Sequence, residues 1–257
     1  MDHISAIIIT KNEERNIRRC LESLAGVADE IIVVDSGSTD ATEALCREAG
    51  VHFERHEWEG YDGQKNYADS LASQEWTLSI DADEALSPEL RESLKRMKQE
   101  GLEPGTVYSV NRLTNYCGRW IQHCGWYPDA RIRLWRTGAA TWDGEVHEEL
   151  LFHEPQSPRT ATLHGDLLHY SYYSVSEHVQ RTAKYATMAG EKAFHQGRRY
   201  RGGLALKTAW TFLRCYLLRG GLLDGRAGYT VSKISSFYTL IKYARLRELT
   251  QQEEDKE

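Results

Sequence analysis

The fold class is indicated most clearly by one stretch, Glu30-Ile31-Ile32-Val33-Val34-Asp35-Ser36-Gly37-Ser38-Thr39-Asp40. A short apolar run ends at an acid and is followed at once by small polar residues. Such a run is typical of a strand buried on both faces of a parallel sheet. Ser, Thr and Asp are residue types that commonly begin a helix, so we expect a helix from this point through Ala49. The stretch therefore predicts one strand–turn–helix unit.

The same alternation of strand and helix extends over the first hundred residues. The apolar runs predict strands at 4–10, 30–34, 51–55 and 76–80, and apolar residues at helical spacing predict helices at 13–24 and 64–71. Alternation with short connections is typical of a doubly wound α/β fold. We therefore expect a Rossmann-like, mostly parallel sheet flanked by helices, with a helical C-terminal extension.

Composition and glycine positions predict the domain organisation. The chain has 257 residues, of which 40% are hydrophobic, enough for a full core. Residues 101–169 are rich in aromatic residues, Gly and Arg, which indicates shorter strands and ordered loops. From 176 onward the pattern is helical, with breaks at glycines 202–203, 220–221 and 225. We expect a catalytic domain at 1–175, a helical region at 176–250 and a polar tail at 251–257.

Charge is distributed unevenly along the chain. The formal net charge of −6 argues against a nucleic-acid partner, since nucleic-acid binders are normally basic. Residues 198–247, however, hold 11 Lys or Arg and a single acid, Asp224. Such asymmetry indicates a negatively charged surface partner, and an anionic membrane fits it. The alternative is a helical region packed on the catalytic domain with its charges solvated.

The compartment follows from the cysteines and the apolar segments. Five cysteines are scattered without the spacing of a disulfide framework. The first apolar run is too short for a signal peptide, and no run approaches the length of a membrane span. We expect a cytoplasmic protein, with peripheral attachment to the cytoplasmic face of the inner membrane as the alternative. The sequence indicates no oligomeric state.

Polar clusters follow three of the predicted strands, where open α/β sheets bind ligands. They lie at 10–14, 35–38 and 81–83. Neither a Walker A motif nor G-x-G-x-x-G is present, which excludes a P-loop NTPase and a standard dinucleotide-dependent enzyme. Alternate side chains of a strand project to the same face, so we expect Asp81 and Asp83 to converge on a hard cation whose oxygen shell a ligand's phosphates complete.

Four stretches together resemble glycosyltransferase family 2, which has the GT-A fold and uses nucleotide-sugar donors. Two of them are Ser5-Ala6-Ile7-Ile8-Ile9-Thr10-Lys11-Asn12-Glu13-Glu14 and residues 31–40, which are quoted above. The other two are Gln64-Lys65-Asn66 and Ile80-Asp81-Ala82-Asp83-Glu84. Residues 125–129, 131–134, 146–148 and 224–228 are similar to the lipopolysaccharide-core β-1,4-glucosyltransferase subgroup.

The resemblance implies roles for individual residues of the donor site. Asp83, Asp81 and His169 would hold Mg²⁺ or Mn²⁺. Ser36 departs from the family's frequent Asp-Asp pair, and Lys65 stands where many relatives have Arg. The residues implied in binding the nucleotide sugar are Thr10, Asn12, Glu14, Asp35, Ser36, Lys65 and Asp81.

The resemblance also implies the catalytic base and the acceptor site. Glu148 is the favoured base, and Glu145 and Asp143 remain alternatives. The residues expected to contact the acceptor are Trp126, Tyr127, Asp129, Arg131 and Arg133.

The resulting expectation is an inverting, metal-dependent glycosyltransferase. It would move a hexose, glucose or a close relative, from a UDP-sugar to a sugar hydroxyl of a lipid-linked core oligosaccharide in lipopolysaccharide biosynthesis. Two alternatives stay open: a sugar nucleotidyltransferase, and a non-catalytic nucleotide-binding protein at the membrane periphery.

Overall fold

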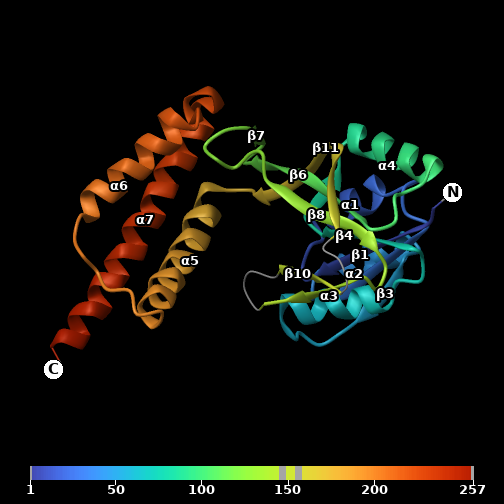
Figure 1. Cartoon of the computed structure of the whole chain (residues 1–257), viewed down its shortest axis with the longest axis horizontal. Helices are drawn as coiled ribbons and strands as arrows, with labels where there is room; N and C mark the ends of the chain where they lie inside the picture. The colour runs from blue at the N-terminus through green and yellow to red at the C-terminus, as the bar shows by residue number, and fades with distance from the viewer. Residues whose placement is uncertain (1, 145–148, 154–157, 256–257) are drawn as a thin grey trace. The chain divides into compact units, whose positions relative to one another are not determined.

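The structure is a computed structural model of the chain, and it describes residues 2–144, 149–153 and 158–255 (Figure 1). The chain forms two compact units, each made of two segments. Unit 1 comprises residues 1–113 and 129–170, and unit 2 comprises 114–128 and 171–257. Unit 2 thus contains the predicted helical region together with a segment from the middle of the chain.

The main sheet has the strand order β3-β2-β1-β4-β8-β6-β11-β5, with β7 paired to β6. Its parallel part consists of β1 (Ile4–Thr10), β2 (Glu30–Asp35), β3 (His52–Arg55) and β4 (Trp76–Asp81). The other strands are β5 (Glu84–Leu86), β6 (Thr106–Tyr116), β7 (Arg119–Ile121), β8 (Ala130–Arg136) and β11 (Arg159–Tyr172). The pairings β4–β8, β6–β8, β6–β7 and β5–β11 are antiparallel. The sheet is therefore mixed, with its parallel part in the first four strands.

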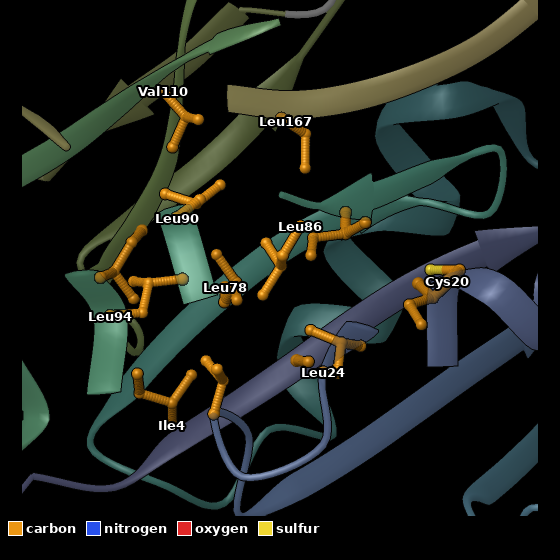
Figure 2. Packing of buried hydrophobic residues seen from close by; sticks show 14 of the residues in the cluster. Ile4, Cys20, Leu24, Leu78, Leu86, Leu90, Leu94, Val110 and Leu167 are labelled. Atoms are coloured by element: carbon orange, nitrogen blue, oxygen red, sulfur yellow. The ribbon is translucent and has the colours of Figure 1, made fainter. Parts of the chain in front are cut away.

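Helices cover both faces of the parallel strands, as a doubly wound sheet requires. Ile4, Ala6 and Ile8 of β1 belong to a buried cluster with residues of α1 (Ile17–Ser23), α2 (Thr42–Glu48) and α4 (Pro88–Glu100). Figure 2 shows this packing around Leu24, Leu78 and Leu90. Ile7 faces the other way and packs with Ala68 of α3 (Gly60–Ser70). Successive residues of one strand thus serve two helical layers, which explains the unbroken apolar run.

A separate two-stranded sheet pairs β9 (Ala140–Asp143) with β10 (Glu149–Phe152). Its apolar side chains, Trp142 among them, cluster with Val107 of β6 and Trp135 of β8. The predicted α/β class with a helical C-terminal region is confirmed.

Unit 2 is built mainly from helices that begin and end near the predicted glycines. They are α5 (Val175–His195), α6 (Leu204–Leu213), the π-helical turn η1 (Arg214–Leu218), the 3₁₀ turn η2 (Gly221–Asp224) and α7 (Gly225–Glu254). A Cβ atom on Gly228 would lie 1.8 Å from the carbonyl oxygen of Gly221, so α7 needs a glycine to start this close to η2. Most of the polar tail is helical, and Arg199 pairs with Glu253 within it.

Candidate active site

The carboxyl ends of three neighbouring strands meet at one edge of unit 1. The register of the sheet places Thr10 beside Asp35 and Ile9 beside Asp81, with β1 between β2 and β4. Three of the sequence motifs therefore converge, although 71 positions separate Thr10 from Asp81 in the chain. This edge is where open α/β sheets bind their ligands.

The loops after β1 and β2 are tied together by side chains. The backbone N–H of Asn12 donates to Ser38 Oγ at 2.8 Å, and Asn12 Oδ1 accepts from the Thr39 N–H at 2.8 Å. Glu14 Oε2 accepts from the N–H of Ala41 at 3.1 Å. Asn12 has a φ of 55°, a left-handed conformation that Asn tolerates better than most residues. Asn12 and Glu14 thus give the two loops a defined shape at the sheet edge.

Asp35 is fully buried and bonded to the loop that follows it. Its Oδ2 accepts from the N–H groups of Gly37 and Ser38 at 2.9 and 2.8 Å, and its Oδ1 accepts from the Ser38 hydroxyl. Ser36 binds back to the carbonyl oxygen of Thr10 through its N–H at 3.0 Å. Asp35 therefore fixes the conformation of the loop that follows β2, and its direct contact with a nucleoside stays a prediction.

Thr10 contributes an uncommitted hydroxyl at the same edge. Its side chain is buried, and its Oγ1 has no hydrogen-bond partner among the described residues. A buried hydroxyl without a partner costs free energy unless a ligand or a water molecule satisfies it. The Thr10 hydroxyl therefore has hydrogen-bonding capacity for a ligand or a water molecule at this edge.

Asp81 is held by two cations. Arg133 Nη2 donates to its Oδ2 at 3.0 Å, and Lys65 Nζ lies 3.7 Å from its Oδ1. Burial by itself would raise the pKa of Asp81, but the charges of Arg133 and Lys65 outweigh it and hold this pKa well below the ordinary value. Asp81 is therefore an anion at neutral pH.

The network around Asp81 extends through Glu84, whose side chain is completely buried. Arg133 Nη2 also donates to Glu84 Oε1 at 2.7 Å, and Glu84 Oε2 accepts from the backbone N–H of Asp81 at 3.0 Å. Arg112 lies 3.8 Å from Glu84 and donates to Asp129 through its Nε and Nη2 at 3.0 and 2.8 Å. This chain of charges, buried at Glu84 and Arg133, ties the end of β4 to β8 and β6.

Of the residues expected at the acceptor, Arg133 is 4% exposed and is engaged in the network around Asp81. Arg131 is exposed and donates from its Nε to Asp129 Oδ1 at 3.0 Å. Arg131 and Asp129 therefore lie together in unit 1. Trp126 and Tyr127 belong to unit 2, where the Trp126 ring packs against those of Tyr116 and Tyr172.

Asp83 and His169 lie side by side. His169 Nε2 is 3.2 Å from Asp83 Oδ2, and both side chains are partly exposed. The antiparallel pairing of β11 with β5 causes this proximity: His169 is in register with Glu84, and the N–H of Tyr170 donates to the Asp83 carbonyl oxygen at 2.9 Å. Residues more than eighty positions apart thus come together by sheet register.

These two groups fit a divalent cation. A carboxylate oxygen and an imidazole nitrogen at this separation are both ligands that Mn²⁺ accepts, and Mg²⁺ favours the oxygen. Asp81 is committed to Arg133 and Lys65 instead. Among the described residues no group of three His, Cys, Asp or Glu side chains gathers as a metal site, so the remaining ligands would come from a bound diphosphate and water.

The predicted catalytic segment starts next to Lys65. Asn66 of α3 holds β9 with two hydrogen bonds of 2.8 Å, one to each backbone polar group of Trp142, and Lys65 Nζ lies 4.5 Å from the centre of the Trp142 ring. Asp143 follows at the exposed end of β9. Glu145 and Glu148 lie outside the described residues. Strand β9, which ends at the candidate base Asp143, is therefore attached beside Lys65.

Sequence reasoning did not single out Glu84, Arg112 or Asn66 as site residues. Glu84 and Asn66 stand within the quoted motifs, and an acid directly after D-x-D was the available signal. No local sequence signal pointed to Arg112, because its role depends on the antiparallel pairing of β6 with β8.

Comparison with known proteins identifies relatives over most of the chain. The family model "Glycosyl transferase family 2" matches residues 5–147. An uncharacterised glycosyltransferase of Rickettsia typhi is 31% identical over 97% of this chain and 88% of its own. The lipopolysaccharide core biosynthesis glycosyltransferase LpsC of Rhizobium meliloti is 32% identical over 95% of this chain and 91% of its own. Among solved structures, glucosyl-3-phosphoglycerate synthase of Mycobacterium tuberculosis shares 24% identity over 44% of each chain, with a TM-score of 0.37.

Proposed function

Because this chain belongs to glycosyltransferase family 2, we propose that it transfers a hexose from a UDP-sugar to a sugar hydroxyl of a lipid-linked core oligosaccharide. Glycosyl transfer itself follows from family membership, which argues against the nucleotidyltransferase and non-catalytic alternatives. The acceptor class is supported by the likeness to LpsC. The observation that carries the proposal is the pair Asp83–His169 at the carboxyl edge of the parallel strands, the edge at which β1 also ends with the buried Thr10 hydroxyl.

The reaction we propose is a single displacement with inversion. The acceptor oxygen forms a bond to the anomeric carbon as the bond from that carbon to the diphosphate oxygen breaks. The acceptor proton passes to a carboxylate, for which Glu148 is our first choice and Glu145 and Asp143 are the alternatives. The UDP anion leaves with the electron pair of the broken bond.

Side chains at the carboxyl edge of the sheet would stabilise the leaving group and hold the donor. Asp83 and His169 would hold Mg²⁺ or Mn²⁺, which when bound supplies Lewis-acid neutralisation of the charge on the departing diphosphate. Lys65 is 5% exposed and lies within the network of Asp81, so it provides a fixed positive charge at the same edge. Arg133 and Glu84 keep Asp81 and the backbone around it in place. Glucose as the hexose and attachment to the cytoplasmic face of the membrane are further parts of this proposal.

A turnover screen tests the proposal. UDP-glucose, UDP-galactose and GDP-mannose are incubated with Mn²⁺ and a truncated core oligosaccharide, and nucleotide release and product mass are measured. We expect a UDP-hexose to be used and the new linkage to be inverted. Preference for the GDP-sugar, or retention of anomeric configuration, would overturn the donor or the mechanism.

A variant series then identifies the base. A positioned general base contributes roughly 10²–10⁴-fold to turnover. We expect a loss of kcat in that range for Glu148→Gln, with the KM for the donor little changed, and smaller losses for Glu145→Gln and Asp143→Asn. If Asp143→Asn alone abolishes turnover, the base is Asp143.

A further inference from the structure

The outer side of α6 and η1 carries an apolar stripe. Leu206, Trp210 and Leu217 have 76, 53 and 52% of their surface exposed, and Leu213 lies between them at 43%. Steps of four, three and four residues place these side chains on one side of a helix. An amphipathic surface helix normally turns its apolar side to the core, and here that side faces outward.

The inner side of α6 is already packed. Ser236 Oγ of α7 donates to the Thr208 carbonyl oxygen at 2.9 Å, and Thr239 Oγ1 donates to Thr211 Oγ1 at 3.1 Å. The Phe212 ring contacts that of Tyr229. Figure 1 shows α6 running alongside α7, which has α5 on its other side. Unit 2 thus holds α6 by its polar and aromatic side, and the leucine stripe is left for another partner.

The apolar surface continues beyond the stripe at the turn that joins η1 to η2. Leu218, Leu222 and Leu223 are 69, 47 and 68% exposed. Gly220, with φ at +66°, reverses the chain between them, which places three leucines at a sharp turn. Contiguous exposed apolar patches commonly mark surfaces that bind another protein or a membrane.

Positive charge surrounds this apolar surface. No acid occurs between positions 198 and 223, whereas the chain outside 198–247 carries a net −16. Arg201, Arg214 and Arg226 are exposed, and none of them pairs with a carboxylate within the part of the chain that the structure describes. The partner is therefore expected to be apolar where the leucines lie and anionic around them.

We propose that α6, η1 and η2 dock unit 2 on an anionic lipid bilayer. The leucine stripe and the turn would enter the interfacial region with Trp210 at headgroup depth, while the three arginines meet lipid phosphates. A second copy of the chain fits less well, because it would bring the same cations against one another. In residues 2–144, 149–153 and 158–255, no helix is long and apolar enough to cross a membrane. The docking specifies the membrane attachment that forms part of the proposed function, and it can succeed or fail independently of sugar transfer.

Vesicle binding by the full chain tests the proposal. Sedimentation is measured with vesicles of phosphatidylglycerol and phosphatidylcholine and with phosphatidylcholine alone. We expect binding to the anionic vesicles that weakens with salt. The variant Arg201→Gln/Arg214→Gln/Arg226→Gln should bind roughly a hundredfold more weakly, at about fivefold for each cation. Leu206→Ser/Trp210→Ser/Leu217→Ser should lose binding even at low salt.

A matched control comes from α5, where Tyr185 and Met188 are 47 and 40% exposed. Tyr185→Ser/Met188→Ser removes two exposed apolar side chains from a helix outside the proposed docking surface. We expect the vesicle binding of this variant to equal that of the unaltered protein. Melting temperatures check that all variants fold, and brominated lipid should quench the unaltered protein more than Trp210→Phe. Absence of binding to anionic vesicles, or equal binding by the stripe variant, would overturn the proposal. A concentration-dependent dimer that the stripe variant abolishes would assign the surface to a second copy.

Discussion

Replacing Arg133 by Met tests the charge network beneath the site. The guanidinium is 4% exposed and donates to both Asp81 and Glu84, at 3.0 and 2.7 Å. Met fills similar space but leaves two carboxylates without their nearest cation. Removing one partner of a buried ion pair costs about 3–5 kcal/mol of the free energy of unfolding.

The remaining cations set the expected size of this loss. Asp81 keeps Lys65 at 3.7 Å, and Glu84 keeps Arg112 at 3.8 Å. Both distances exceed those to Arg133, so Lys65 and Arg112 compensate only in part for the missing guanidinium. We expect Arg133→Met to lower the free energy of unfolding by about 3 kcal/mol. Arg136 is exposed on the same strand, and Arg136→Met should change the free energy of unfolding by less than about 0.5 kcal/mol.

Urea unfolding followed by tryptophan fluorescence measures both variants. The pKa of Asp81 is held low in the folded state, so its stabilising contribution is present above its ordinary pKa and disappears as the pH falls through the folded value. The deficit of Arg133→Met should therefore be full at neutral pH and shrink below about pH 4. A deficit below about 1 kcal/mol at neutral pH, or one that grows on acidification, would refute the assigned roles.

Three further variants test other parts of the structure. Asn66→Ala removes both hydrogen bonds to Trp142, so we expect a loss of about 1–3 kcal/mol in urea unfolding and a lower kcat, because the end of β9 with Asp143 loosens. Burial and a nearby arginine lower the pKa of His178 from 6.5 to about 4. The unfolded chain therefore binds a proton more readily, and the free energy of unfolding should decrease by up to about 3 kcal/mol as the pH falls from 6.5 to about 4. His178→Phe should remove that pH dependence, and an unchanged slope would contradict it. Gly228→Ala places a Cβ atom 1.8 Å from the Gly221 carbonyl oxygen and should cost about 1–3 kcal/mol by thermal unfolding, whereas no loss would show that η2 can move aside.

The parallel half of the fold was predictable because its signals are local. The runs at 4–10 and 30–35 are apolar on both faces, which only a strand between two helical layers requires. The polar residues that end them mark the ligand edge by a general rule of open sheets. Helix ends were less exact: residues 38–40 were expected to cap a helix that runs through Ala49, but α2 begins at Thr42 and ends at Glu48.

The antiparallel half was not predictable because it depends on pairing between distant segments. Nothing in 101–169 shows that β8 joins β4 or that β11 reaches β5, and those pairings decide the surroundings of the acids. Arg131 and Arg133 stand two apart in a strand and look equivalent in sequence. One is exposed and the other buried, because only Arg133 faces Asp81 and Glu84. The proximity of His169 to Asp83 likewise follows from register, and the sequence indicated it only through the family resemblance.

Calorimetric titration of UDP into the full chain, with and without Mn²⁺, tests whether Asp83 and His169 form the metal site of the donor. If Asp83 and His169 hold the cation that meets the diphosphate, Mn²⁺ should strengthen UDP binding in the unaltered protein and in Asp143→Asn, which keeps both groups. In Asp83→Asn this enhancement should vanish. Equal affinity for UDP with and without Mn²⁺, or an undiminished enhancement in Asp83→Asn, would contradict the assignment of the donor site to this edge.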